Sequence, residues 1–126
     1  MKYIIDSSLW IEYLDGSKSG EKINEILNED NEVFTLAPII SEVISKVKRK
    51  DGNHEIAYEA IIKNSKFFEI TPRISKESGL LHAQKRKKIK NFPLVDAIII
   101  CSAKNLKAQV LTQDNHFKSF KEATIL

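Results

Sequence analysis

Short apolar runs in this chain alternate with longer stretches in which apolar residues recur every three or four positions. The short runs predict strands at residues 2–6, 33–37, 67–70 and 108–112, and a fifth at 123–126. The longer stretches predict helices, among them 75–88 and 94–106, the latter apolar on nearly every side and therefore buried. Strands alternating with helices indicate an α/β fold with a mostly parallel sheet of four to five strands, covered on both faces.

Capping and turn residues set the limits of several predicted elements. Ser7 or Ser8 can cap the first helix, Pro38 suits the first turn of the helix after the second strand, and Ser75 is the expected N-cap of helix 75–88. Thr71 and Pro72 are expected to end the third strand. We find no repeat, low-complexity stretch or linker, so residues 1–126 are expected to form a single domain.

Four carboxylates occupy positions next to apolar segments. Asp6 ends the first apolar run, Glu42 and Asp96 lie inside apolar helical segments, and Asp114 follows the last long run. A charged group placed against a core costs on the order of several kcal/mol, because it loses its hydration, unless it is paired or binds a cation. Parallel sheets bind ligands at the carboxyl ends of their strands, so Asp6 and Asp114 meet there if their strands are neighbours. Asp96 and Glu42 can reach the same crevice.

Acidic side chains without histidine or cysteine partners favour a hard cation, Mg²⁺ or Mn²⁺, over Zn²⁺. Such ions activate water and neutralise charge on a phosphodiester, so these residues point to phosphodiester hydrolysis. Ser8 can hydrogen-bond Asp6 or a metal-bound water. His82 and His116 stand at no metal-ligand spacing to another histidine, and we leave both out of the catalytic set.

Each acid also has a structural explanation that the sequence leaves open. Asp6 could cap the helix that follows it, Glu42 could face solvent beside two serines, and Asp114 could be a turn residue. Asp96 could favour its helix N-terminus through the macrodipole, an effect worth about 0.3–1 kcal/mol at a surface.

Charge is distributed unevenly along the chain, whose net charge is +3. Residues 1–45 carry nine acidic and three basic groups, whereas residues 46–126 carry eight acidic and seventeen basic groups. Basic clusters of this kind can meet a phosphate backbone, although taken alone each is better explained as a solvated helix end. An acidic metal site nearby moves the interpretation toward nucleic acid. The candidate RNA-binding residues are Lys46, Lys48, Arg49, Lys85, Arg86, Lys87 and Lys88.

The single cysteine, Cys101, lies in an apolar segment and excludes a disulfide within the chain. The first apolar run is too short for a signal peptide or a membrane span. We therefore expect a cytoplasmic protein with no membrane partner.

The motifs that hold the four acids resemble those of the PIN-domain nucleases, and among them the VapC-type toxins of prokaryotic toxin–antitoxin pairs. They occur in the family's order over nearly the whole chain: YIIDSSLW at 3–10, IISEV at 39–43, FPLVDAII at 92–99 and LTQDNHF at 111–117.

This resemblance implies a three-layer α/β/α domain and a Mg²⁺- or Mn²⁺-dependent endoribonuclease. It also implies that Asp6 and Asp96 are the principal metal ligands, that Glu42 and Asp114 complete the acidic site, and that Ser8 supports it. Toxin members commonly form homodimers and are silenced by a small antitoxin. Some relatives carry a further acid after the last aspartate, where this chain has Asn115 and His116.

Two other functions fit the same sequence. One is a noncatalytic PIN-like module that binds RNA or a partner, against which the complete set of four acids argues. The other is a phosphoacceptor receiver domain, which would need an acceptor aspartate at the end of its third strand, where this chain has Thr71 and Pro72.

Overall fold

A computed structural model describes residues 1–126, which form a five-stranded sheet in the order β3-β2-β1-β4-β5. Every neighbouring pair of strands is parallel, so the predicted α/β class is confirmed and the sheet is parallel throughout. The strands are β1 (Lys2–Ile5), β2 (Glu32–Thr35), β3 (Lys66–Phe67), β4 (Gln109–Thr112) and β5 (Ala123–Ile125).

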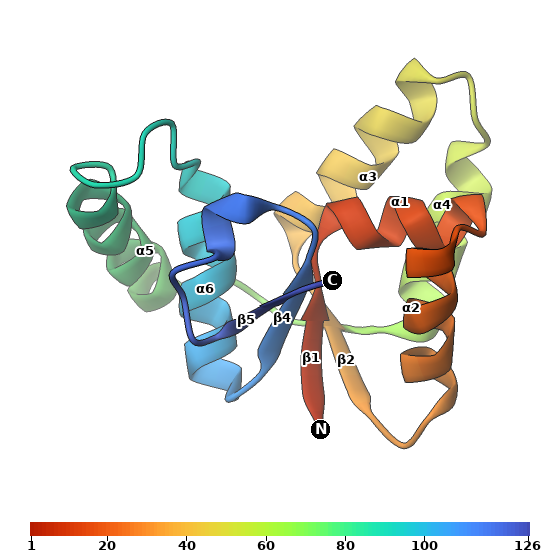
Figure 1. Cartoon of the computed structure of the whole chain (residues 1–126), viewed down its shortest axis with the longest axis horizontal. Coiled ribbons are helices and arrows are strands. Elements are labelled where there is room, and N and C mark those ends of the chain that lie inside the picture. The colour runs from red at the N-terminus through yellow and green to blue at the C-terminus, as the bar shows by residue number, and fades with distance from the viewer.

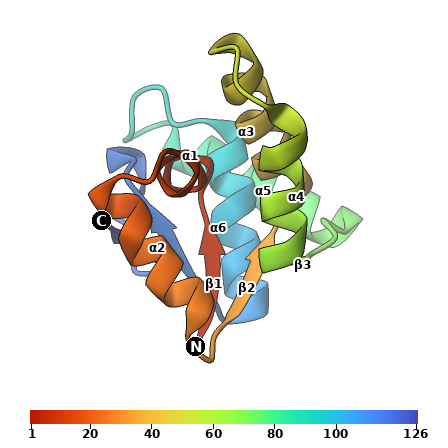
Figure 2. The ribbon, with the colours of Figure 1, turned by 90° about the vertical axis from the view of Figure 1, so that its right-hand side faces the viewer.

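Helices cover both faces of the sheet, as predicted (Figure 1). One group comprises α1 (Ser7–Asp15), α2 (Lys18–Asn28), α3 (Ala37–Arg49) and α4 (His54–Asn64), and the other comprises α5 (Pro72–Lys85) and α6 (Leu94–Leu106). Right-handed crossovers explain this division, because the chain moves outward from β1 to β3 and then returns across the sheet to β4. Figures 1 and 2 together place α2 and α6 on opposite sides of β1.

The core forms around the central strands and α6. Ile4, Trp10, Ile100 and Val110 are fully buried in one contiguous cluster that joins the sheet to helices on both faces. Helix α6 contacts both β1 and β4 and packs against α5 on its outer side, which explains why its sequence is apolar almost all round. No helix of the chain is both long and apolar enough to cross a lipid bilayer.

Helices α1 and α2 approach each other closely at Gly20. A Cβ atom at this position would lie 2.1 Å from the carbonyl oxygen of Glu12, so no larger residue fits without moving a backbone. The N-terminus of α2 is fixed nearby, because the Gly20 N–H donates to the Ser17 hydroxyl at 3.1 Å.

The region between β2 and α5 differs from the sequence prediction. Strand β3 covers only Lys66 and Phe67, both exposed at the sheet edge, rather than 67–70. Helix α5 begins at Pro72, because the Thr71 hydroxyl accepts the Ile74 N–H at 3.2 Å and caps the helix. The predicted N-cap at Ser75 is therefore wrong, and Ser75 lies in the first turn, donating to the Thr71 carbonyl at 3.0 Å. The helix ends at Lys85, before the predicted 88.

Candidate metal centre

The carboxyl ends of β1 and β4 bring the first and last acidic residues together. The two strands are direct neighbours, with Ile5 opposite Leu111 in the register, and the Asp6 N–H donates to the Leu111 carbonyl at 2.9 Å. Connections leave β1 and β4 toward opposite edges of the sheet, so the order of strands reverses between them. This point is where open parallel sheets bind ligands.

A threonine that the sequence analysis did not select links the two acids. The buried Thr112 hydroxyl donates to Asp6 Oδ2 at 2.8 Å and accepts the Asp114 N–H at 2.9 Å. Ser8 also donates to Asp6 Oδ2, at 3.3 Å, and accepts the Gln113 N–H at 3.2 Å. These bonds fix the Asp6 carboxylate between the two strand ends.

Asp6 stands at the N-cap position of α1, but its side chain makes no capping hydrogen bond to that helix. The residue is 5% exposed, and burial raises the pKa of its carboxyl group, with a further increase from nearby Asp114. Hydrogen bonds from Thr112 and Ser8 oppose this increase. Capping alone therefore does not account for Asp6.

Asp96 projects from the first turn of α6, which follows Pro93 at the N-cap position. The residue is 7% exposed, and its Oδ2 atom is buried without any hydrogen-bond partner. Burial, followed by the charges of Asp6 and Asp114, raises the pKa of Asp96 to about 8. A helix N-terminus contributes too little to offset this cost.

Asp114 and His116 face Asp96 from the segment after β4. Asp114 Oδ1 accepts the His116 N–H at 2.9 Å and so caps a short 3₁₀ helix (Asn115–Phe117), which agrees with the turn role left open by the sequence. His116 Nδ1 lies 3.1 Å from Asp114 Oδ1 and 3.7 Å from Asp96 Oδ2. One ligand atom from each of the three residues lies within 4.8 Å of the other two. The sequence offered no spacing rule that would have selected His116.

Glu42 approaches the same acids from α3. Leu36 precedes this helix and Pro38 lies in its first turn, so the helix starts directly after β2 and presents Glu42 near the sheet end. The residue is exposed overall, as its solvent-facing interpretation predicted. Even so, partial desolvation of its carboxyl group and the charge of Asp6 raise the pKa of Glu42. Glu42 also contributes to the raised pKa of Asp96, so the four acids share one electrostatic environment.

A hard divalent cation fits this donor set. No lysine or arginine forms an ion pair with any of the four acids, and His116 is the basic side chain that pairs with Asp96 and Asp114. The buried Asp96 oxygen lacks a donor, and a bound cation would supply the missing partner. The residues that can hold such an ion are Asp6, Asp96 and Asp114, with Glu42 at the rim and Ser8 supporting Asp6.

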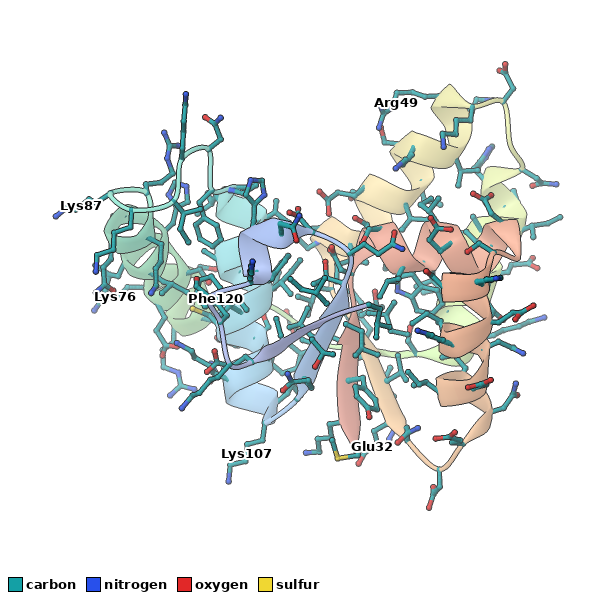
Figure 3. The ribbon with its side chains drawn as sticks, viewed as in Figure 1. Glu32, Arg49, Lys76, Lys87, Lys107 and Phe120 are labelled. Carbon is teal, nitrogen blue, oxygen red and sulfur yellow. The ribbon has the colours of Figure 1, made fainter.

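The two basic clusters lie on different elements beside this centre. Lys46 and Arg49 line a surface pocket of about 350 Å³ together with Ser7, Ser41, Ser45 and Glu42. The second cluster covers the end of α5 and the turn after it, where Lys85 Nζ lies 5.2 Å from the centre of the Phe120 ring. Figure 3 shows Arg49 and Lys87 on opposite sides of the sheet.

Comparisons with known proteins agree with this architecture. A toxin–antitoxin complex from Klebsiella pneumoniae is similar at 19% identity, over 97% of this chain and 95% of the other, with a TM-score of 0.75. VapBC2 from Rickettsia felis, bound to a fragment of its promoter DNA, gives 17% identity, 100% and 98% coverage and a TM-score of 0.74. VapC20 of Mycobacterium tuberculosis, a toxin that cleaves the sarcin–ricin loop, gives 15% identity, 94% and 95% coverage and a TM-score of 0.73.

At these identities the likeness to solved structures shows a shared fold. No curated protein matched the chain in sequence. A family model described as the PIN domain matches residues 3–123. Since this match spans almost the whole 126-residue chain, the protein belongs to the PIN-domain family.

Proposed function

We propose that residues 1–126 form a single nuclease domain that hydrolyses RNA phosphodiester bonds with Mg²⁺ or Mn²⁺. Asp6, Glu42, Asp96 and Asp114 are its catalytic and metal-binding residues, and Ser8 supports Asp6. The observation that carries this proposal is the buried Asp96 oxygen, which has no hydrogen-bond donor and lies among three other carboxyl groups. Such an arrangement is costly in a metal-free protein and favourable around a divalent cation.

The four acids have distinct tasks in this proposal. A bound divalent cation supplies Lewis-acid activation of water and neutralises charge on the phosphodiester. Asp6 and Asp96 hold the ion, and Thr112 keeps the Asp6 oxygen in place through its 2.8 Å hydrogen bond. Glu42, which is exposed and has a raised pKa, accepts a proton from the attacking water at its carboxylate oxygen. Asp114 closes the site on the β4 side.

RNA is the proposed substrate because basic groups flank the acids. Lys46 and Arg49 share a pocket with Glu42, so a phosphate next to the cleaved bond can rest there while the scissile group reaches the acids. Lys48 adds an exposed positive charge on the same helix, and the cluster of Lys85, Arg86, Lys87 and Lys88 offers a second contact on the other side of the sheet.

We further propose that the protein is the toxin of a type II toxin–antitoxin pair, that it acts in the cytoplasm and that it forms a homodimer. Support comes from the structural neighbours, several of which are toxins or toxin–antitoxin complexes. A growth assay tests the antitoxin partner: expression of the chain should arrest growth, and co-expression of the small neighbouring reading frame should relieve the arrest. Arrest without relief would contradict the antitoxin proposal.

Cleavage of structured RNAs in Mg²⁺ or Mn²⁺ tests the enzymatic proposal. Asp6→Asn and Asp96→Asn should each lower the cleavage rate at least about a hundredfold, because each removes a ligand that acts directly at the reacting centre. Asp30→Asn is a matched control, since Asp30 is exposed and lies outside the site. Equal cleavage by the wild type and the double variant would refute the assignment.

The same experiment separates the alternatives left by the sequence. RNA binding without cleavage or metal binding would favour a noncatalytic module. The strand order argues against the receiver-domain alternative. Receiver domains have the flavodoxin-like order 2-1-3-4-5, whereas the order here is β3-β2-β1-β4-β5.

A further inference from the structure

We propose that His116 is a ligand of the metal ion, together with Asp96 and Asp114, and that its nitrogen makes this position prefer Mn²⁺ over Mg²⁺. The inference rests on the proposed metal site and specifies its ion. It assigns a role to His116, which lies in the region after the last aspartate where some relatives carry a further acid.

The distances among the three side chains suit a common ion. His116 Nδ1 is 3.1 Å from Asp114 Oδ1 and 3.7 Å from Asp96 Oδ2. An ion with ligand bonds of about 2.1 Å separates adjacent ligand atoms by about 3.0 Å in an octahedron and about 3.4 Å in a tetrahedron. The two His116 distances exceed the octahedral spacing by about 0.1 and 0.7 Å, and the ligand atoms of Asp96 and Asp114 lie within 4.8 Å of each other. Small adjustments of the side chains would therefore bring the three atoms around one cation.

The donor atoms of Asp96 and His116 are also available for a metal bond. Asp96 Oδ2 is buried and has no hydrogen-bond partner, so a metal bond would replace no existing contact. The His116 side chain is 36% exposed, and its Nδ1 atom lies 3.3 Å from Asp114 Oδ2, which is a hydrogen bond when Nδ1 carries the proton. In the tautomer with its proton on Nε2 that hydrogen bond is absent, and the Nδ1 lone pair can bind a metal instead. The Nε2–H group can then donate a hydrogen bond to water at the surface.

Asp6 is placed differently from these three residues. Its Oδ2 atom already accepts hydrogen bonds from Thr112 and Ser8, which hold it at the end of β1. Asp6 therefore contributes charge and its second oxygen to the centre, while Asp96, Asp114 and His116 form the compact group of ligand atoms.

Nitrogen in the ligand set changes the expected ion. Mg²⁺ prefers oxygen ligands and octahedral water-rich sites, whereas imidazole suits transition ions such as Fe²⁺, Ni²⁺ and Zn²⁺. Mn²⁺ shares the oxygen preference of Mg²⁺ but, as the first member of the transition-ion affinity series, gains more from a nitrogen ligand. A site in which one imidazole joins the carboxylates should hence bind Mn²⁺ at least about tenfold more tightly than Mg²⁺. An all-oxygen site of the same charge should discriminate less.

Metal binding measured without RNA tests this inference. Calorimetric titration with Mn²⁺ and with Mg²⁺ compares the wild type with His116→Asn and His116→Gln, and pulsed electron paramagnetic resonance of the Mn²⁺ complex reports a coordinated ¹⁴N nucleus. His54→Asn is the matched control, because His54 is partly exposed and pairs only with Glu55. Thermal unfolding with a chelator present confirms that each variant is folded.

We expect a ¹⁴N signal in the wild type that the His116 variants lose and the His54 variant keeps. The preference for Mn²⁺ should fall at least about tenfold in the His116 variants, with Mg²⁺ affinity changed much less. Equal weakening of both ions without a ¹⁴N signal would overturn the inference and leave His116 as a residue that orients Asp114.

Failure of this inference is distinguishable from failure of the proposed function. Histidine-dependent Mn²⁺ binding in a protein that cleaves no RNA would support the ligand and refute the nuclease. Metal-dependent RNA cleavage with an unchanged ion preference in His116→Asn would support the nuclease and refute His116 as a ligand.

Discussion

Replacing Asp96 with asparagine should stabilise the metal-free protein above neutral pH and abolish its stabilisation by Mn²⁺. Burial and the neighbouring acids raise the pKa of Asp96 from 3.8 to about 8. The folded protein therefore binds more protons than the unfolded chain between these values, and its stability falls as pH rises through that window. The loss is complete above pH 8, and the asparagine variant does not suffer it.

The size of the effect follows from the same pKa. A change from 3.8 to about 8 corresponds to about 6 kcal/mol at about 1.36 kcal/mol per pKa unit, which is the upper limit for an isolated group. Asp6 and Glu42 also have raised pKa values, so protons are shared within the cluster and a single substitution relieves only part of the cost. We expect Asp96→Asn to gain about 2–4 kcal/mol over the wild type at high pH.

Urea unfolding in the presence of a chelator measures this difference at about pH 4, 6, 7.5 and 9, a range that spans the window between the two pKa values. The advantage of the variant should be small at the lowest pH, grow through the window and level off above pH 8. Adding Mn²⁺ at a hundred times its Kd should stabilise the wild type by about 2.7 kcal/mol and leave the variant unchanged. Asp30→Asn should show neither effect. An advantage that does not vary with pH would refute the electrostatic reasoning.

Three further predictions concern other parts of the molecule. Thr112→Val should destabilise the protein by about 1–3 kcal/mol in urea unfolding and slow RNA cleavage, with recovery in Thr112→Ser, because valine removes the shorter of two hydrogen bonds to the buried Asp6 oxygen and leaves the Asp114 N–H unpaired. Gly20→Ala should destabilise by more than about 2 kcal/mol, whereas Gly79→Ala, in an open helical position, should stabilise by about 0.5–1 kcal/mol; both are measured by denaturant unfolding. Removing the charges of Lys46 and Arg49 should weaken RNA binding and lower its salt dependence, measured by fluorescence anisotropy at several salt concentrations, with Lys22→Ala as the unaffected control.

Much of the site could be predicted because its acids follow strands or begin helices. Asp6 and Asp114 each follow an apolar run, and the parallel sheet that such runs predict brings strand ends to one edge. The sequence could not show whether β1 and β4 are neighbours, since strand order depends on which helices cover which face. The structure supplies that order.

Thr112 and His116 could not be selected from local pattern, and the N-cap of α5 is predicted four residues too far along the chain, at Ser75 rather than Thr71. Thr112 matters because its hydroxyl lies between two residues that are distant in sequence, and a threonine at a strand end has no special signature. His116 gains its position from the turn that Asp114 caps. At α5, Thr71 followed by Pro72 is a helix-start signal, but the prediction of a strand reaching Ile70 assigned these two residues to the end of that strand.

The Thr112 hydroxyl ties the positions of Asp6 and Asp114 to the pairing of two strands. Because it bonds Asp6 from one strand end and the backbone of Asp114 from the next, the distance between these carboxyl groups follows the pairing of β1 with β4. The acids are therefore brought together when the sheet forms, so a cation at the proposed centre would find the Asp6 carboxylate already oriented. On that proposal, metal binding would require little ordering of loops, and weaker pairing of β1 with β4 would lower the metal affinity.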